Sequence, residues 1–161
     1  KSNRYQLTIT GSVSIDKSLI DSQHLIISSE GYYPEKIKLN NSDSYIIDMT
    51  KLDQKYILED LLFDYDSYKL TESVKNFLFL YAQWLKQNDE INIRIEGHTD
   101  SVGSDNYNMT LSENRANEVL NFFVSEGILK NRMKAIGFGD KIPVAEGYDG
   151  PKNRRIEITV F

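Results

Sequence analysis

The sequence predicts an α+β fold: a two-layer β-α-β-α-β-β domain with both helices on one face of a mixed sheet, preceded by a small β segment. Two observations lead to this prediction. Short apolar runs separated by turn residues fill the chain up to about residue 50, which is typical of strands. From residue 57 onward, strand-like runs enclose two segments whose apolar residues recur every three or four positions, as in helices. We therefore expect two domains, residues 1–52 and residues 53–161.

The β segment contains several short strand-like runs. YQLTITGSVSI alternates apolar and polar residues, and HLIISS, KIKL and SYIIDM follow, separated by EGYYPE and NNSD. About 45 residues of strand bury too little apolar surface to be stable alone, so we expect the segment to dock on the next domain or to belong to a larger β domain. The pattern around SSEGYYPEKIKL is similar to the last strands of a carboxypeptidase-regulatory-like β sandwich.

The larger domain is predicted to begin with a strand, a helix and a second strand. ILEDLLF is a short apolar run suited to a buried strand, and Thr71 offers a hydroxyl cap for the helix after it. The apolar stripe of that helix runs from Val74 to Leu85 and ends near QND. INIRIEGHT places isoleucines inward with Arg94 and Glu96 outward, which predicts a half-buried strand.

A second helix and two final strands complete the predicted domain. The helix has an apolar stripe from Tyr107 to Phe123, and Gly127 follows where a left-handed C-cap residue belongs. Two residues are candidates for the start of this helix, because Ser104 and the capping box that begins at Thr110 both suit a helix N-terminus. MKAIGF and RRIEITVF then supply two strands around the turn-rich GDKIPVAEGYDGPKN.

Composition excludes several classes of function. Nineteen Lys and Arg against 24 Asp and Glu give a net charge of −5, which argues against binding to nucleic acid or to acidic lipid. No stretch approaches the ~18 apolar residues that a membrane span requires. The opening KSNRYQLT lacks the apolar core of a signal peptide, so we expect any export signal or lipidated cysteine to lie upstream.

We expect no enzymatic activity, no cofactor and no metal. The chain has no cysteine for a thiolate site or nucleophile, and it lacks G-x-S-x-G and H-E-x-x-H. Glu96 and Asp100 are the only local pair of carboxyl groups, and Glu96 is expected to point outward. DSVGSDN fails the spacing of a calcium loop, and no third glycine or helix follows Gly137-Phe-Gly139 to make a phosphate loop.

Three features nevertheless favour a binding site. Residues 97–100, Gly-His-Thr-Asp, leave the central strand at its carboxyl end, where ligands commonly sit. Arg115 falls on or beside the apolar stripe of the second helix, and an unpartnered guanidinium there would cost several kcal/mol, so an acidic partner is expected. Asn153, Arg154 and Arg155 precede the last strand. Together these residues predict a cleft lined by a carboxylate, one or two guanidinium groups and amides.

Structural interpretations of the same residues stay open. Asp100 suits an Asx turn or a cap for the second helix. Arg115 suits an internal bridge to Asp100. For His98, a hydrogen-bonded packing role is favoured over a role as ligand or base.

The stretch from Phe63 to Phe161 resembles the OmpA C-terminal-like peptidoglycan-binding domain, the family of the peptidoglycan-associated lipoprotein Pal and of the periplasmic part of the stator protein MotB. Four motifs, FDYD, IEGHTDSVGSDNYNMTLSENRANEV, GFGDKIPV and KNRRIEI, have the order and spacing of that family. The resemblance covers about three-fifths of the chain, and a chance match of all four motifs in register is hard to obtain.

The resemblance implies noncovalent binding of the peptidoglycan stem peptide, typically through its meso-diaminopimelate residue, without catalysis. Asp100 would hold the ammonium group of the D-centre, and Arg115 would hold its carboxylate by a planar two-point match. Asp66 falls where family members carry an Asn or Asp that contacts the peptide. The pocket walls and backbone donors of the family fall on Thr99, Leu111, Ser112, Asn153 and Arg154.

The resemblance also implies a place in the cell. Such a domain would anchor an outer-membrane or periplasmic assembly to the wall, so we expect a periplasmic location with outer-membrane association through regions outside this chain. The upstream β segment and the bias toward Asn, Lys, Ile and Tyr are similar to Bacteroidota-type carriers, including the PorE-like component of the type IX secretion system, with outer-membrane or secretion-complex proteins as further partners. A protein interaction module of the same fold without wall binding stays the alternative.

Overall fold

The structure, a computed structural model, describes residues 5–7, 20–21, 24–29, 31–38, 47–59, 63, 67–144 and 151–161. The chain divides into two compact units, Lys1–Gln54 and Lys55–Phe161, and each is described by itself. Within the described residues, no helix is long and apolar enough to cross a membrane.

The described part of the first unit consists of short antiparallel strands. They are β1 (Tyr5–Leu7), β2 (Ile20–Asp21), β3 (His24–Ile27), β4 (Glu35–Lys38) and β5 (Ile47–Met49). β1 pairs with β5, and β2, β3 and β4 form a sheet in that order. Each of the runs HLIISS, KIKL and SYIIDM therefore contains a strand or most of one, whereas residues 8–15 of the first predicted run lie outside the described residues.

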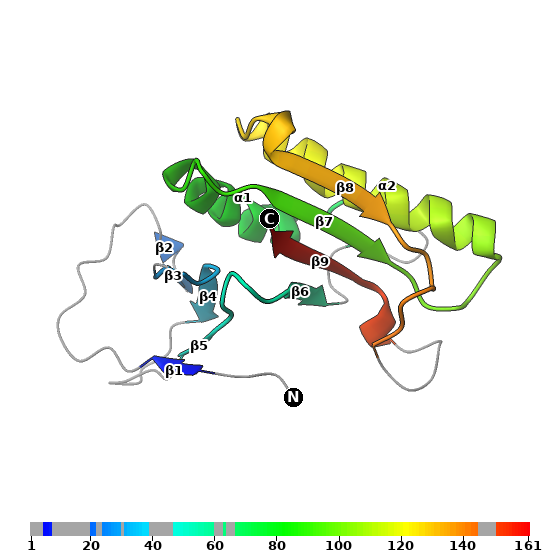
Figure 1. Ribbon diagram of the computed structural model, residues 1–161, viewed down its shortest axis with the longest axis horizontal. Coiled ribbons are helices and arrows are strands. Elements are labelled where there is room, and N and C mark those ends of the chain that lie inside the picture. The colour runs from blue at the N-terminus through cyan, green and yellow to red at the C-terminus, as the bar shows by residue number, and fades with distance from the viewer. Residues whose placement is uncertain are drawn as a thin grey trace. The chain divides into compact units, whose positions relative to one another are not determined.

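The second unit has the predicted β-α-β-α-β-β order. Its elements are β6 (Tyr56–Glu59), α1 (Glu72–Gln87), β7 (Ile93–His98), α2 (Asp105–Ser125), η2 (Lys130–Arg132), β8 (Met133–Gly137), η3 (Pro151–Asn153) and β9 (Arg155–Val160), where η marks a 3-10 turn. The sheet order is β6-β9-β7-β8, with β7 parallel to β8 and the other pairs antiparallel. Both helices lie on the same face of this mixed sheet (Figure 1), which confirms the predicted fold class.

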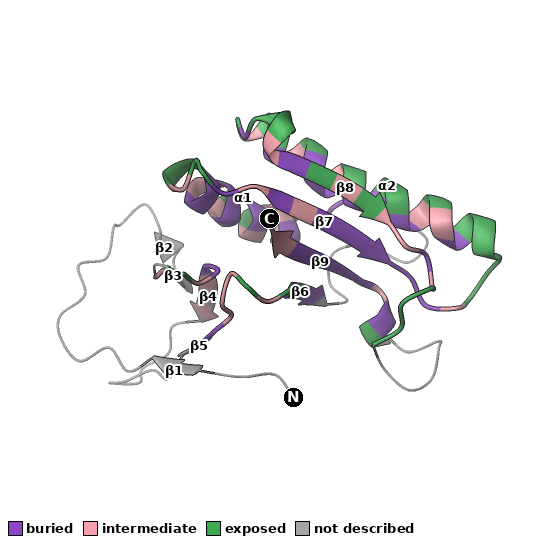
Figure 2. Ribbon diagram, viewed as in Figure 1, coloured by how far each residue is buried: buried purple, intermediate pink, exposed green. Residues whose placement is uncertain are grey.

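The core lies between the sheet and its two helices. Ile95 pairs with Ile158 across β7 and β9, and both side chains are fully buried. From the helices, Leu78 and Phe123 are likewise buried, and the Tyr81 ring lies 5.8 Å from the Phe123 ring, which joins α1 to α2. Buried residues accordingly run along β7 and β9 (Figure 2). This core makes the sheet a rigid platform for the loops at its ends.

The ends of both helices follow from local chemistry. Ser104 is the N-cap of α2, and its hydroxyl oxygen accepts a hydrogen bond from the Tyr107 backbone N–H at 3.3 Å. Thr110 lies inside the helix instead, where its hydroxyl donates to the Asn106 carbonyl at 2.9 Å, so the capping box does not mark the start. Gly127 follows the helix with φ +92°, as predicted.

At the end of α1, the Arg132 guanidinium supplies the donors that the last carbonyl groups lack. It donates to the carbonyl oxygens of Leu85 at 3.0 Å and Asn88 at 2.7 Å, and to that of Ile91 just before β7. One side chain from η2 therefore ties the end of α1 to the start of the central strand.

β6 accounts for the first part of the predicted strand ILEDLLF, residues 60–62 lie outside the described residues, and Phe63 forms an isolated bridge with Leu70. One sequence prediction needs correction. β7 is not half-buried, because Glu96, on its outward face, is 2% exposed. A network of charged side chains covers that face, as described below.

Candidate functional site

The loop that leaves β7 is held by its own polar side chains. Asp100 accepts a hydrogen bond from the Val102 backbone N–H at 3.2 Å through Oδ1, which is the Asx turn foreseen as the structural interpretation. Its other oxygen, Oδ2, lies 2.8 Å from Nη1 of Arg154. The Thr99 backbone N–H donates to the Gly139 carbonyl at 2.9 Å, which ties this loop to the loop after β8. The carboxylate is thus fixed in place with a cation beside it.

Two glycines allow α2 to approach this end of the sheet. A Cβ atom at Gly97 would lie 2.2 Å from the Ser112 carbonyl oxygen, and one at Gly137 would lie 2.4 Å from the Glu113 backbone nitrogen. The backbone of α2 therefore rests directly on β7 and β8, closer than any side chain would permit. The Ser112 hydroxyl then accepts a hydrogen bond from the Gly139 N–H at 2.8 Å, which joins the helix to the same loop that Thr99 contacts.

Arg115 lies one helical turn beyond Ser112 and is 6% exposed. Its Nε donates to the Ser67 carbonyl oxygen at 3.0 Å, and its guanidinium lies over the Phe63 ring, 5.0 Å from the centroid. The side chain therefore reaches the segment between β6 and α1 and packs there against an aromatic ring. Such stacking suits a planar guanidinium better than an ammonium group.

The residues just before β9 are the last group of predicted site residues near this end of the sheet. Asn153 is buried, and its Oδ1 accepts a hydrogen bond from the Val144 backbone N–H at 2.9 Å. Arg154 reaches Asp100, whereas the next residue, Arg155, lies on the sheet face opposite the helices and pairs with Glu157 at 2.7 Å. The two adjacent arginines thus pair with different carboxylates, as expected for neighbouring residues at the start of a strand.

The structure gathers most of the predicted site residues near one end of the sheet. Asp100 and Arg154 contact each other, Thr99 and Ser112 both bind Gly139, and Asn153 immediately precedes Arg154. Leu111 is half-buried beside Ser112 on α2. Asp66 lies outside the described residues, although its neighbour Ser67 binds Arg115.

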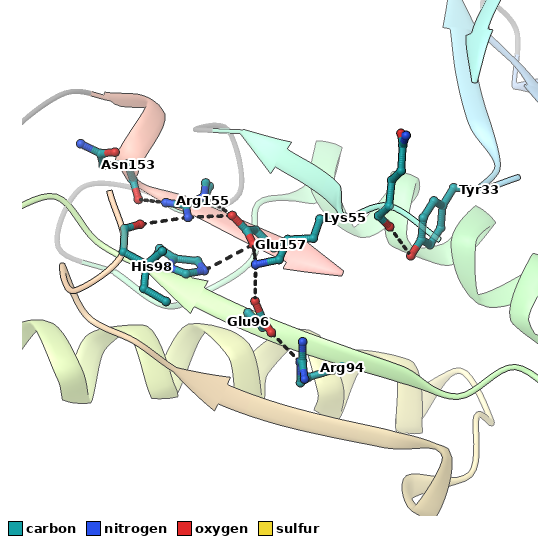
Figure 3. Close-up of polar contacts among 10 residues, drawn as sticks. Tyr33, Lys55, Arg94, Glu96, His98, Asn153, Arg155 and Glu157 are labelled. Carbon is teal, nitrogen blue, oxygen red and sulfur yellow. Dashed lines mark hydrogen bonds and ion pairs between the residues drawn. The ribbon is translucent and has the colours of Figure 1, made fainter. Parts of the chain in front are cut away.

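Sequence analysis missed a second charged cluster, on the sheet face opposite the helices (Figure 3). The Lys55 ammonium lies 2.5 Å from Glu157 Oε2 and 3.1 Å from Glu96 Oε2. Arg155 holds the other oxygen of Glu157 at 2.7 Å, and Arg94 holds that of Glu96 at 2.5 Å. The side chains of both glutamates are 3% exposed, so the carboxylates are buried but neutralised. The one available signal was the alternation of charged and apolar residues along RRIEI and RIEGH.

The same cluster contains the described residues that are best placed to bind a metal. One ligand atom from each of Glu96, His98 and Glu157 lies within 4.8 Å of the others. Lys55 already bridges the two carboxylates, however, and two arginines hold their remaining oxygens. Three cations face two carboxylates, so a divalent ion would enter a region of excess positive charge. The donor set therefore does not fit a metal site, and we assign the cluster as a structural ion network.

The His98 side chain lies buried within this network. Its ring stacks on Phe138, with centroids 5.4 Å apart, and Nε2 lies 3.9 Å from Glu157 Oε2. Burial and the charge of Arg155 lower the pKa of His98 to about 4, and the neighbouring carboxylates offset this only in part. Burial would raise the pKa of Glu157, but its bonds from Lys55 and Arg155 outweigh burial and lower that pKa.

These shifts predict that the second unit loses stability in mild acid. An unfolded chain protonates His98 near its ordinary pKa of 6.5, whereas the folded domain does so only near pH 4, so stability falls as the pH decreases between these values. Glu157 adds a loss below its ordinary pKa of 4.5. For His98 we expect a loss on the order of 2 kcal/mol, measured by urea unfolding from pH 7.5 to 4. His98→Gln should flatten the curve between pH 6.5 and 4, and an unchanged slope in that variant would contradict the assignment.

Fold and site together define a small α+β domain with a carboxylate and guanidinium groups at one end of its sheet. The chain belongs to the OmpA family, whose model matches residues 62–157. It is 40% identical over 105 residues to outer membrane porin F of Pseudomonas aeruginosa, a match that covers 63% of this chain and 30% of the porin. The chain thus spans less than a third of that relative's length.

Two solved structures are similar to the second unit. The peptidoglycan-associated lipoprotein from Burkholderia pseudomallei is 32% identical with a TM-score of 0.59, over 65% of this chain and 91% of that one. The cell wall anchor of the T6SS from Pseudomonas aeruginosa is 28% identical with a TM-score of 0.57, over 66% of this chain and 80% of that one. The predicted membership and fold are confirmed. The relatives are described as a porin, a lipoprotein and an anchor rather than as enzymes, in agreement with the sequence prediction.

Proposed function

We propose that the second unit binds the peptidoglycan stem peptide noncovalently, through its meso-diaminopimelate residue, and anchors an outer-membrane or periplasmic assembly to the cell wall. The observation that carries the proposal is the position of Asp100 and Arg115. Both are at least nine-tenths buried, and they lie on the exit of the central strand and on the helix that rests against it. The names of the peptidoglycan-associated lipoprotein and of the cell wall anchor support association with peptidoglycan.

The chemistry of the two side chains suits a zwitterionic amino-acid centre. Asp100 would accept the ammonium group, and Arg115 would hold the carboxylate with two parallel N–H donors. Because Asp100 is fixed by its Asx turn and Arg115 by Ser67 and Phe63, neither side chain needs much ordering on binding. Thr99, Ser112 and Asn153 would supply the surrounding walls, and Asp66 a further contact to the peptide.

The expected affinity for one stem peptide is modest. A charge-assisted hydrogen bond contributes about 1.5–3 kcal/mol, and a few such bonds must first offset the entropy of association. Micromolar to millimolar binding is therefore expected. The wall repeats the same unit many times, so a tethered or oligomeric carrier would bind it through effective concentration.

The location and the larger assembly are part of the proposal. We place the domain in the periplasm, associated with the outer membrane through regions outside this chain. We propose that the predicted first domain, residues 1–52, connects the wall-binding domain to outer-membrane or secretion-complex proteins such as those of the type IX system.

Loss of either charged side chain should remove wall binding. We expect Asp100→Ala and Arg115→Ala each to lower co-sedimentation with purified sacculi at least tenfold, because each leaves one charge of the ligand unpaired. The measurement is the bound fraction against sacculus concentration, with circular dichroism to show that each variant is folded. Asp105→Asn removes an exposed carboxylate from the start of α2 and serves as the control.

Three results would contradict the proposal. Retained binding in both alanine variants would remove Asp100 and Arg115 from the site. Absence of binding by the unmodified chain would favour the alternative, an interaction module of the same fold without wall binding. Release of soluble muropeptides from labelled sacculi would instead indicate a hydrolase.

A further inference from the structure

Three large apolar side chains near the proposed peptide site are exposed to solvent. Tyr107 is 45% exposed, Tyr68 is 46% exposed and Val102 is 59% exposed. None of them has a part in the proposed function. A tyrosine ring offers a large apolar face, a polar hydroxyl group and few rotatable bonds, which is why tyrosines are enriched at binding surfaces. The position of Tyr107 gives it a specific relation to the site.

Tyr107 continues the helix face that carries Arg115. Tyr107, Leu111 and Arg115 follow one another at intervals of four positions on α2, so they lie one above another on the same face. Exposure increases along this face, because Arg115 is 6% exposed, Leu111 is half-buried and Tyr107 is 45% exposed. Eight helical positions correspond to about 12 Å along the helix axis. The face therefore leads from the buried guanidinium to an exposed aromatic ring.

Tyr107 also borders the loop that carries Asp100. A Cβ atom at Gly103 would lie 3.2 Å from Cδ1 of Tyr107, so the ring lies close to the backbone of this loop. Val102, the residue before Gly103, donates its backbone N–H to Asp100 and exposes its own side chain to solvent. Tyr107 thus lies beside both elements that hold the proposed ligand, the loop with Asp100 and the helix with Arg115.

We propose that Tyr107 binds the sugar ring from which the stem peptide extends, an N-acetylated amino sugar of the wall. The inference rests on the proposed function, because that function places the diaminopimelate carboxylate at Arg115. Two amino-acid residues separate diaminopimelate from the sugar. At ~3.3–3.6 Å for each extended residue, the sugar lies about 10 Å or more from that carboxylate. The spacing of Tyr107 from Arg115 along α2 matches this reach.

Tyr68 is as exposed as Tyr107 but belongs to the other end of the peptide. It follows Ser67, whose carbonyl oxygen accepts a hydrogen bond from Arg115 Nε at 3.0 Å. The backbone of Tyr68 therefore lies beside the residue that would hold the diaminopimelate carboxylate, too near for the sugar.

The surroundings of Tyr107 favour an uncharged group. Asp105 and Lys141, at the start of α2, pair with each other at 2.5 Å, so these two exposed charges offset one another. Tyr107 and Val102 both expose apolar surface there. The C–H face of a sugar ring can pack on an aromatic ring while its hydroxyl groups stay in water, and the phenol hydroxyl group can bond to the acetamido group.

Two ligands that differ only in the sugar ring test the inference. One is the N-acetylmuramoyl tripeptide that ends in meso-diaminopimelate, and the other is the same tripeptide with a lactoyl group alone. By calorimetric titration of the full chain, we expect the ligand with the sugar to bind about three- to tenfold more tightly. In Tyr107→Ala the two affinities should agree within about twofold, with the affinity for the sugar-free ligand unchanged.

Two further variants serve as controls. Tyr107→Phe keeps the ring and should retain most of the preference for the ligand with the sugar. Tyr68→Ala removes an equally exposed tyrosine from the other side of the site and should retain the full preference. Circular dichroism shows that each variant is folded.

Failure of the inference and failure of the proposed function give different results. If the unmodified chain binds both ligands equally, the sugar contact is overturned and stem-peptide binding stands. A preference that survives Tyr107→Ala, or that is lost in Tyr68→Ala instead, would assign the sugar to another surface and overturn the inference. An equal loss for both ligands in Tyr107→Ala would make Tyr107 a peptide contact and would also overturn it. If the unmodified chain binds neither ligand, the proposed function fails, and the inference fails with it.

Discussion

Gly97→Ala is expected to lower the free energy of unfolding of the second unit by at least about 3 kcal/mol, at the upper end of the cost of overpacking a core. The added Cβ would lie 2.2 Å from the Ser112 carbonyl oxygen, which belongs to the backbone of α2 and cannot rotate away. Relief requires α2 to move off the sheet. That movement would also strain the hydrogen bond from Gly139 to Ser112 and shift Arg115 relative to Asp100.

Gly127→Ala is the matched control. Its φ of +92° makes any side chain unfavourable, but the added methyl group would meet only the flexible end of Lys86, at 3.8 Å. A loss of about 1–2 kcal/mol is expected there, from the backbone conformation alone. Denaturant unfolding of both variants provides the comparison. Equal losses at the two positions would show that close packing of α2 on β7 is not what requires glycine at position 97.

Glu157→Gln is expected to cost about 3 kcal/mol of unfolding free energy, because it leaves a buried guanidinium without its anion. Glu157 receives Lys55 on one oxygen and Arg155 on the other. Lys55 is half-exposed and can turn to water, but the Arg155 side chain is 1% exposed and has no such route. Urea unfolding at pH 7.5 measures the loss while His98 is neutral.

Two further variants make this prediction sharper. Asp105→Asn breaks an exposed pair with Lys141 of the same 2.5 Å length and should leave the unfolding midpoint almost unchanged, since water screens that pair. The double variant Arg155→Met, Glu157→Leu removes both buried charges and should be more stable than Glu157→Gln alone. A double variant less stable than the single one would show that the network stabilises the fold beyond mutual neutralisation of its charges.

Local patterns were sufficient to predict most of the elements. The apolar stripe from Val74 to Leu85 predicted α1, because 3.6-residue periodicity is visible in any window of that length. The residues at which helices begin were harder to predict. Ser104 and Thr110 offered equivalent capping chemistry, and the choice depended on where the chain leaves the loop at Gly103, whose φ is +109°.

The exposure of the outward face of β7 was predicted incorrectly, because the burial of a side chain depends on which residues from other strands pack against it. Alternation correctly separates Ile95 from Glu96, but it does not tell whether the second face meets water. Glu96 lies opposite Glu157 only because β9 inserts between β6 and β7 in one register. Lys55, the residue just before β6, comes to both carboxylates from 41 positions earlier in the chain than Glu96, and no local pattern contains that information.

The two-layer fold, the order of its elements and the set of residues from which a site is built could all be predicted from the amino-acid sequence, because periodicity, caps and motif spacing are local properties of the chain. Which charged side chains contact each other depends on the folded arrangement. It paired Asp100 with Arg154 across 54 positions, directed Arg115 to Ser67, and buried two glutamates under three cations. Electrostatic partners depend on strand register and on the distance at which a helix packs, and both are fixed only when the whole sheet forms.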